Sequence, residues 1–346
     1  MSDTSEPPRR GVWVLMFDRL SSADFSEGGW SDAFDALEMQ STYFEQYLLQ
    51  DVRDSVSLVD VLGGQEAMDR FGIELRASGR STGVLRIVSD TTIFDDQTAC
   101  LNRQVSAERC LTSEPIDNDG LWQSDSELQA VLSSDFVWID ARVDDGGTAV
   151  AGRVLEVIRQ LRKSVAQIPG LQSILIVSVL RGSDRTIAAP FMAGLPESRA
   201  HVPLWIDNGI PHACRIQSIV GSGDLLPTVA ELLTGIEADS VLDQTTEMAW
   251  MAEQLPLSGS AMSLVSLCNA PRDVPDRILK LTGDGWTARR TQGFLLVDRP
   301  LEVTPAQPPA SHELTASRLY LKPDDLWNVN DVIGTYAEVA DEMARA

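Results

Sequence analysis

Cysteine, histidine and long apolar runs are scarce in this chain, and each shortage argues against a class of protein. The 346 residues include four cysteines and three histidines. The cysteines form no C-x-x-C pair and do not cluster with histidine, so neither a zinc site nor a disulfide framework is indicated. We expect all four to be reduced thiols; they are Cys100, Cys110, Cys214 and Cys268.

Basic residues are also few, with 28 Lys and Arg against 51 Asp and Glu, which gives 28 − 51 = −23. A surface of this sign repels phosphate backbones and anionic lipid headgroups, so we expect neither a nucleic-acid nor a membrane partner. No run reaches the ~20 apolar residues that span a bilayer. The polar residues 1–10 are followed by no secretory apolar region. We therefore expect a cytoplasmic protein.

Short apolar runs alternate with amphipathic segments. The apolar runs predict buried strands over residues 11–17, 83–88, 136–139, 174–179 and 202–206. Helical spacing predicts helices over residues 33–49, 65–77, 126–132, 148–167 and 225–233, with Asp224 as the N-cap of the last. This alternation indicates an α/β protein with a mostly parallel sheet flanked by helices.

No linker rich in Pro, Gly or Ser divides the chain cleanly. We expect a flexible tail over residues 1–10, an α/β core over 11–240, and a connection with a C-terminal subdomain over 241–346. Within the last range, residues 293–297 and 318–321 predict short strands, and residues 329–346 are amphipathic. A small terminal sheet with a helix is the expected arrangement.

Several motifs then resemble one known family. The sequence H-V-P-L at 201–204 and D-L-L-P-T at 224–228, followed by L-T-G-I at 233–236, are nearly intact motifs of the sulfatase branch of the alkaline phosphatase superfamily. Residues 288–296 and 318–325 resemble the end of the same family. Residues 325–332 are similar to a shortened sulfatase-like group typical of planctomycete bacteria. The resemblance implies a sulfatase-like fold across nearly the whole chain.

The family's nucleophile motif is missing. A sulfatase cleaves a sulfate ester with a hydrated aldehyde made from Cys or Ser in a C/S-x-P-S-R motif, and a divalent cation held by acidic side chains neutralises the charged group. No such motif occurs here. The spacing of the resemblance places Arg53 at the nucleophile position and Ser57 at the motif's arginine. Neither Ser55 nor Ser57 has a flanking histidine, so ordinary serines are favoured over activated ones.

The two metal-binding motifs are also degraded. The resemblance matches the first to Asp18 and Arg19, so one carboxylate remains and a positive charge stands beside it. It matches the second, Asp-His-Gly or Asp-Asn-Gly, to Leu180 and Arg181 followed by glycine, so both ligands are gone. Asp18 is either a residual ligand or, as we favour, a strand-end residue that caps a loop.

The other metal-ligand candidates are weak. Asp184 follows the second motif closely, although an exposed loop aspartate is the favoured interpretation. His201, His212 and His312 have no metal-ligand spacing to one another, and the H-x-C pair of His212 and Cys214 is a weak signal.

The leading hypothesis is a catalytically inactive sulfatase-like protein that serves as a binding or regulatory scaffold. It would need no cofactor, and its ligand would be an anionic small molecule or an unidentified protein. Arg19, Arg181 or Arg53 would receive the anion.

Two alternatives stay open. One is a sulfuric or phosphoric ester hydrolase with a rearranged Ca²⁺ or Mg²⁺ site around Asp18, Asp90 and Asp184. The other is a structural partner, including a homo-oligomer, that associates through tryptophans. Core packing is favoured for those tryptophans, which are Trp250, Trp286 and Trp327.

Overall fold

The computed structural model describes residues 9–18, 37–53, 71–73, 75, 77–87, 109–113, 126–141, 149–182, 197–207, 214–234, 261–269, 277–283, 286–298, 317–325 and 328–346. The strands in these ranges are β1 (Arg9–Asp18), β2 (Thr42–Leu48), β3 (Thr82–Ile87), β4 (Arg109–Ser113), β5 (Phe136–Ala141), β6 (Leu171–Arg181), β7 (Leu204–Asp207), β8 (Cys214–Gly221), β9 (Leu279–Gly283), β10 (Trp286–Arg290), β11 (Phe294–Asp298) and β12 (Arg318–Leu321). The helices are α6 (Ser126–Leu132), α7 (Ala149–Val165), α8 (Glu197–Ala200), the 3₁₀ turn η3 (Ser222–Asp224), α9 (Leu225–Thr234), α11 (Val265–Asn269) and α12 (Ala337–Arg345).

The main sheet has eight strands in the order β4-β3-β5-β1-β6-β7-β2-β8. Neighbouring strands are parallel except for β7, which runs antiparallel to both β6 and β2. The carboxyl ends of β1, β2, β3, β4, β5, β6 and β8 therefore meet at one edge of the sheet. That edge is where open α/β sheets bind ligands.

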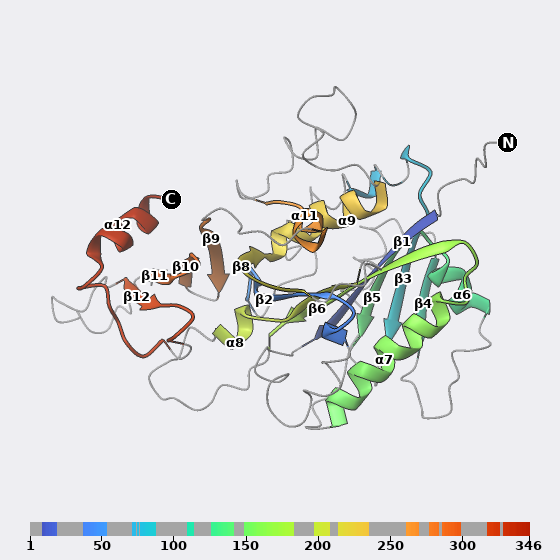
Figure 1. Ribbon diagram of the computed structural model, residues 1–346, viewed down its shortest axis with the longest axis horizontal. Helices are drawn as coiled ribbons and strands as arrows, with labels where there is room; N and C mark the ends of the chain where they lie inside the picture. The colour runs from blue at the N-terminus through green and yellow to red at the C-terminus, as the bar shows by residue number, and fades with distance from the viewer. Residues whose placement is uncertain are drawn as a thin grey trace, which may run out of the picture.

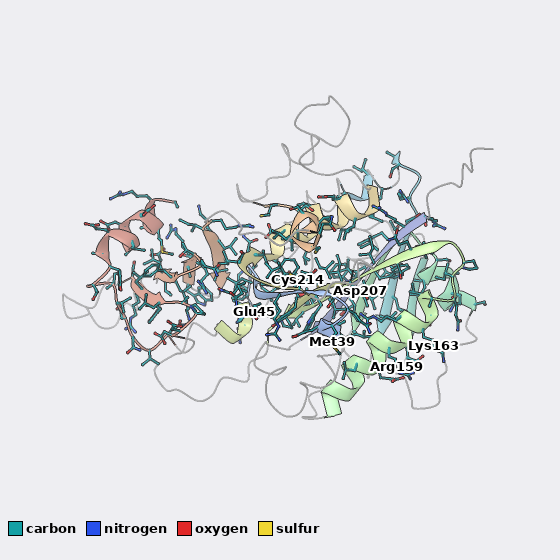
Figure 2. The ribbon with its side chains drawn as sticks, viewed as in Figure 1. Met39, Glu45, Arg159, Lys163, Asp207 and Cys214 are labelled. Carbon is teal, nitrogen blue, oxygen red and sulfur yellow. The ribbon has the colours of Figure 1, made fainter. Side chains whose placement is uncertain are left out.

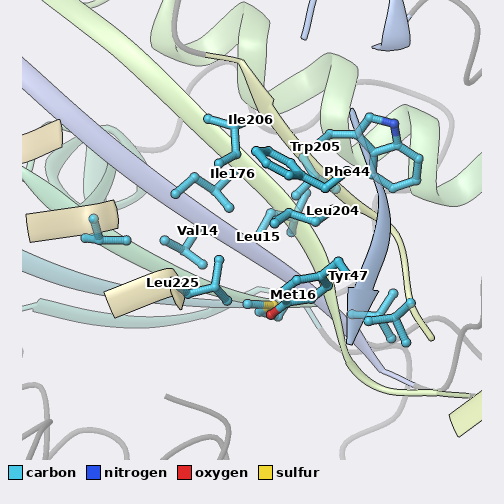
Figure 3. Packing of buried hydrophobic residues seen from close by; sticks show 14 of the residues in the cluster. Val14, Leu15, Met16, Phe44, Tyr47, Ile176, Leu204, Trp205, Ile206 and Leu225 are labelled. Atoms are coloured by element: carbon cyan, nitrogen blue, oxygen red, sulfur yellow. The ribbon is translucent and has the colours of Figure 1, made fainter. Parts of the chain in front are cut away.

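Helices cover both faces of this sheet, with α6 and α7 on one side and α9 and α11 on the other (Figure 1). The central strand β1 is apolar on both sides for this reason: every residue from Val12 to Phe17 is at most 1% exposed. Figure 3 shows side chains of β1, β2, β6 and β7 packed together with Leu225, the first residue of α9. The parallel strands are thus fixed within a continuous core.

The smaller sheet is antiparallel, in the order β12-β11-β10-β9. One face contributes buried residues such as Leu281, Ala288 and Val297 to the main core. The other packs against α12, where Leu296 and Leu319 form a separate buried cluster together with two helix residues, Ala340 and Met343. Alternate residues of β11 therefore serve two different cores, as the period of a strand requires.

Backbone hydrogen bonds join the two sheets just after β2. The N–H of Thr282 donates to the carbonyl of Gln50 at 2.8 Å, and the N–H of Val52 donates to the carbonyl of Thr282 at 2.8 Å. Gln292, after β10, donates to the carbonyl of Gln217 in β8 and accepts from the N–H of Ile219. The small sheet is therefore joined to the carboxyl-edge side of the main sheet and to its edge strand β8.

The expected fold class is confirmed: a mostly parallel α/β sheet flanked by helices, with a small C-terminal sheet and helix. The five expected strands, the helices at α6, α7 and α9, and the short strands β11 and β12 are all present. β1 begins at Arg9, inside the range 1–10 that was expected to precede the core. Among the described residues, no helix has the length and apolarity that crossing a bilayer requires.

The helix predicted over residues 33–49 is wrong where the structure describes it. Only residues 37–38 are helical, and Thr42–Leu48 form strand β2. β-branched and aromatic residues fill this strand, among them Thr42, Tyr43, Phe44 and Tyr47, and such side chains pack well on a pleated surface. Strands β4, β8, β9 and β10 were not predicted. β4, β9 and β10 have five residues each, and β9 and β10 alternate between buried and less buried residues.

Candidate functional site

The ends of β1 and β6 bring together the two positions that the sequence matched to metal motifs. Phe17 pairs with Val179, but Asp18 pairs with Arg181, so β6 has one extra residue, Leu180, at this point. Such a β-bulge changes which side chain of a strand faces a given neighbour, and bulges are frequent beside functional sites. Without it, Leu180 would be the partner of Asp18.

This register sets the charge of the site. Because Asp18 and Arg181 are Cα partners, an acidic and a basic residue occupy neighbouring backbone positions at the edge. Leu180 is partly buried against the apolar core, and Gly182, which the family motif also contains, is buried. The leucine therefore serves packing, while the arginine occupies the position next to Asp18.

A further carboxylate belongs to the same edge. Asp140 is the penultimate residue of β5 and is the Cα partner of Met16, two residues before Asp18. Its side chain is half-buried. No local sequence pattern selects Asp140, because its place at this edge depends on β5 and β1 being neighbours.

The described residues of this edge do not fit a divalent cation of the sulfatase kind. Hard cations take several oxygen ligands, whereas the second motif offers an apolar and a cationic side chain. Across the described ranges, no group of three or more His, Cys, Asp or Glu residues is arranged to hold a metal. Arg19, Ser55, Ser57, Asp90 and Asp184 lie outside the residues that the structure describes.

Arg53 follows β2 and its partner is Asp51. The Arg53 Nε–H donates to both carboxylate oxygens of Asp51, at 2.9 and 3.0 Å, and the Arg53 backbone N–H donates to Oδ1 at 3.1 Å. A second guanidinium nitrogen also contacts Oδ2. This neighbour offsets the charge of the arginine at the expected nucleophile position.

No known protein family and no curated protein matches this sequence. Solved structures, in contrast, match over almost the whole chain. Ps i-CgsB, in complex with k-i-k-neocarrahexaose, has a TM-score of 0.62 at 13% identity and covers 98% of this chain and 92% of its own. An alkaline phosphatase superfamily protein from Vibrio parahaemolyticus has a TM-score of 0.60 at 14% identity, covering 98% and 89%. A 4S-sulf protein of glycosaminoglycan metabolism from Bacteroides thetaiotaomicron has a TM-score of 0.58 at 10% identity, covering 98% and 94%.

This chain has the same fold as these solved structures, one of which is a protein of the alkaline phosphatase superfamily, and we call it the sulfatase-like fold. At such low identities the likeness concerns the fold alone. The chemistry must therefore be judged from the residues of this chain.

The first intact motif of the sulfatase-like fold, at 201–204, holds β7 in place. The buried hydroxyl of Ser178, in β6, donates to the carbonyl of Pro203 at 2.9 Å, and the N–H of Val202 donates to the carbonyl of Tyr47 at 3.2 Å. His201 Nε2 contacts the carbonyl of Glu45 at 2.5 Å. These bonds join β2, β6 and β7, so the motif acts on the backbone.

The second intact motif, at 224–228, is also structural. Asp224 is fully buried, and its carboxylate accepts from the N–H of Gly221 at 2.8 Å and of Met262 at 2.9 Å. It also accepts two bonds from Arg277, at 2.9 and 3.0 Å. Burial raises the pKa of Asp224, and Arg277 opposes that shift. The predicted N-cap role needs correction, because Asp224 ends the turn η3 and reaches back to Gly221.

Thr228 completes this arrangement one turn later. Its hydroxyl donates to the carbonyl of Asp224 at 2.5 Å and accepts from the N–H of Leu264 at 2.9 Å. The motif thus holds residues 262–264 against the start of α9. The motifs at 201–204 and 224–228 thus support the backbone of the fold, and the positions matched to metal motifs lie at the ends of β1 and β6.

Burial also raises the pKa of two tyrosines in β2. Tyr47 is fully buried, and burial, followed by the charge of Asp224, raises the pKa of its phenol. The partly buried Tyr43 has a pKa raised to about 12, mainly by burial and then by Glu38 and Glu45. Neither phenol is therefore a source of phenolate at neutral pH.

Of the remaining tryptophan and histidine candidates, Trp286 lies within the described residues. Trp286 is 7% exposed, which confirms core packing for this residue, while Trp250 and Trp327 lie outside the described residues. His212 and His312 lie outside them as well.

Sequence reasoning missed two ionic clusters. Arg277 lies 53 positions from Asp224, and no local pattern links them. At the amino ends of the strands, Asp135 accepts from Arg9 Nε at 2.7 Å and from the N–H and hydroxyl of Ser81, each at 2.8 Å. Burial alone would raise the pKa of Asp135, but these donors lower it to about 2.

Proposed function

We propose that this chain is a non-catalytic sulfatase-like protein that binds a small tetrahedral anion at the carboxyl edge of its main sheet, with Arg181 as the receiving side chain and no metal cofactor. The observation that carries the proposal is the register of β1 and β6, which makes Arg181 the partner of Asp18. A guanidinium at this position supplies the positive charge that a divalent cation supplies in an active sulfatase. It also offers paired N–H donors that suit sulfate or phosphate oxygens.

Asp18 has a defined part in this site. When no ligand is bound, a neighbouring carboxylate lowers the free-energy cost of removing the guanidinium from water, because the two charges compensate each other. It also limits affinity, since an incoming anion must compete with it. We therefore expect weak binding in the wild type and tighter binding in Asp18→Asn.

The experiment is a thermal-shift titration with sodium sulfate and sodium phosphate, against sodium chloride at equal ionic strength. A ligand that binds only the folded state stabilises by about 1.4 kcal/mol at ten times its Kd. We expect a saturable rise in Tm with sulfate or phosphate beyond that with chloride, and its loss in Arg181→Met. Arg159→Met serves as the control, because Arg159 is an exposed arginine on α7 (Figure 2). Identical curves for the three salts would contradict the proposal.

The hydrolase alternative is favoured by one observation, the presence of Asp140 near Asp18 at the same edge. Its test is hydrolysis of p-nitrophenyl sulfate and p-nitrophenyl phosphate with Ca²⁺, Mg²⁺ or Mn²⁺ added. Turnover that depends on the metal and is lost in Asp18→Asn and Asp140→Asn would establish an enzyme and overturn the scaffold proposal. Absence of turnover together with the anion-dependent Tm shift supports the scaffold.

A further inference from the structure

Apolar side chains are exposed on the C-terminal subdomain. Among the residues that the structure describes, four large apolar side chains are exposed: Met39, Ile73, Val329 and Tyr336. Two of these four lie close to α12 in the sequence, with Val329 at 69% and Tyr336 at 38% exposure. The ring of Tyr336 lies against that of Phe294, in β11, with 5.4 Å between the ring centroids. Single exposed apolar residues are ordinary on protein surfaces, so their neighbours decide whether they form a patch.

The neighbours of this aromatic pair are apolar and only partly buried. The cluster between α12 and the small sheet has four buried residues, and five partly buried ones pack against it: Ile278, Phe294, Val332, Ile333 and Val339. The main core has the opposite balance, with many buried residues and few partly buried ones. The N–H of Tyr336 donates to the carbonyl of Val332 at 3.0 Å, which places the tyrosine beside this cluster. We call Phe294, Val332, Ile333, Tyr336 and Val339 the terminal apolar patch.

The terminal apolar patch belongs to the outer side of the subdomain. One face of the small sheet packs on the main core, and α12 packs on the other face. In Figure 1, α12 lies at the end of the molecule away from α6 and α7. The patch is therefore separate from the helices that cover the main sheet.

The surroundings of the patch are acidic. Residues 324–325 and 328–346 carry one basic side chain, Arg345, and six acidic ones: Asp324, Asp325, Asp331, Glu338, Asp341 and Glu342. The exposed Asp331 directly precedes Val332, and the exposed Glu338 directly precedes Val339. The Asp331 carboxylate accepts from the backbone N–H groups of Leu319 and Ile333, each at 3.1 Å, which orient it without neutralising its charge. Negative charge therefore borders the apolar residues.

We propose that the terminal apolar patch docks a partner protein that presents a basic amphipathic helix. The apolar side chains of that helix cover Tyr336 and the partly buried residues around it, and its Lys or Arg side chains lie beside Asp331 and Glu338. A second copy of this chain does not fit, because a symmetric interface places two acidic borders against each other. Burial of the patch supplies affinity, and the charges supply orientation and a faster association.

Binding of a synthetic probe tests this proposal. The probe is a fluorescein-labelled peptide of leucine and lysine, with the leucines on one face of the helix, and binding is followed by fluorescence anisotropy. The comparison peptide has serine in place of each leucine and keeps the same charge. We expect saturable one-to-one binding of the leucine peptide and none of the serine peptide at the same concentrations.

Two variants of the patch should weaken this binding. In Tyr336→Ser the Kd should rise about tenfold, as is usual when an aromatic anchor of an interface is removed. Tyr336 is the N-cap residue of α12, and serine is a favoured N-cap, so this variant should fold. In Glu338→Gln the Kd should rise by a smaller factor and depend less on salt.

Two matched variants separate docking from general attraction to an acidic surface. Met39→Ser removes another exposed apolar side chain, before β2, and Glu156→Gln removes a charge on α7. Both should keep the wild-type Kd. Hydrogen exchange of the wild-type protein with and without the leucine peptide locates the contact without any variant, and we expect slower exchange within residues 329–343.

Several results would overturn the inference. Absence of binding, equal affinity for the two peptides, or equal losses in Tyr336→Ser and Met39→Ser would leave only attraction to the net charge of −23 or no interaction at all. Slower exchange elsewhere, with none within residues 329–343, would place the contact on another surface. A dimer in analytical ultracentrifugation that is lost in Tyr336→Ser would make the patch a contact between copies of this chain.

Discussion

Removal of the buried arginine two residues before β9 should severely destabilise this protein. Arg277 is 8% exposed in its side chain, and Asp224 is 0% exposed. In Arg277→Met the aliphatic part of the side chain is approximately retained, but both guanidinium bonds to Asp224 are lost. The carboxylate then keeps only the N–H groups of Gly221 and Met262 as donors.

The magnitude follows from the cost of an unpaired buried charge. Breaking a buried ion pair by removing one partner costs about 3–5 kcal/mol. Asp224→Asn should cost a similar amount, because it leaves the Arg277 guanidinium buried against a neutral amide. The double variant should lose less than the sum of the two single losses, since neither charge is then left alone.

Urea denaturation followed by tryptophan fluorescence measures these losses. Arg159→Met is the matched control, because Arg159 is 61% exposed and its partner Glu156 lies three residues away on the same helix. We expect its denaturation midpoint to stay at the wild-type value. A loss below about 1 kcal/mol in Arg277→Met would refute the argument that this pair holds residues 262–264 and β9 to the core.

Two further predictions concern stability. In the folded protein the pKa of Asp135 is lowered to about 2 from 3.8, so its carboxyl binds a proton more weakly than in the unfolded chain. The ionised carboxylate therefore adds to the free energy of unfolding at neutral pH, and this contribution is lost as pH falls from about 4 through 2. Asp135→Asn should therefore lose about 1–2 kcal/mol at pH 7 and less at pH 2.5 by urea denaturation; equal losses at both pH values would contradict this. A Cβ at Gly283 would overlap the indole of Trp286, whereas one at Gly293 would meet nothing within 4 Å. Gly283→Ala should lower the free energy of unfolding by about 1–3 kcal/mol and lower Tm. A Tm equal to that of Gly293→Ala would contradict this prediction, because it would mean that the indole can move aside without loss of stability.

Much of the fold was predictable, because its determinants are local. The uninterrupted apolar run of β1 and the apolar stripe of α7 each lie within one continuous segment of the sequence. The structure contains both elements as predicted. The segment 42–48 was mistaken for a helix because its apolar residues also fit helical spacing. Its position between β7 and β8 gives the side chains of this segment a sheet environment on both sides.

The sequence predicted which positions belong to the site but not which of their residues are partners. Sequence matching placed Asp18, Leu180 and Arg181 at the family's metal motifs, and the structure brings the first and last of these together as partners. The extra residue in β6 depends on the pairing of two strands more than 150 residues apart in sequence, so it leaves no local signal. The same holds for Asp140 and Arg277, whose neighbours are determined by strand order and not by spacing.

The most direct test of the central claim is the metal content of the purified protein, measured by elemental analysis together with the change in Tm on adding Ca²⁺, Mg²⁺, Mn²⁺ or EDTA. If Arg181 supplies the positive charge beside Asp18, the protein will carry no stoichiometric divalent metal, and none of these additions will shift Tm. One tightly bound divalent ion per chain, with a fall in Tm on adding EDTA and loss of the ion in Asp18→Asn, would contradict the account and restore Asp18 as a metal ligand.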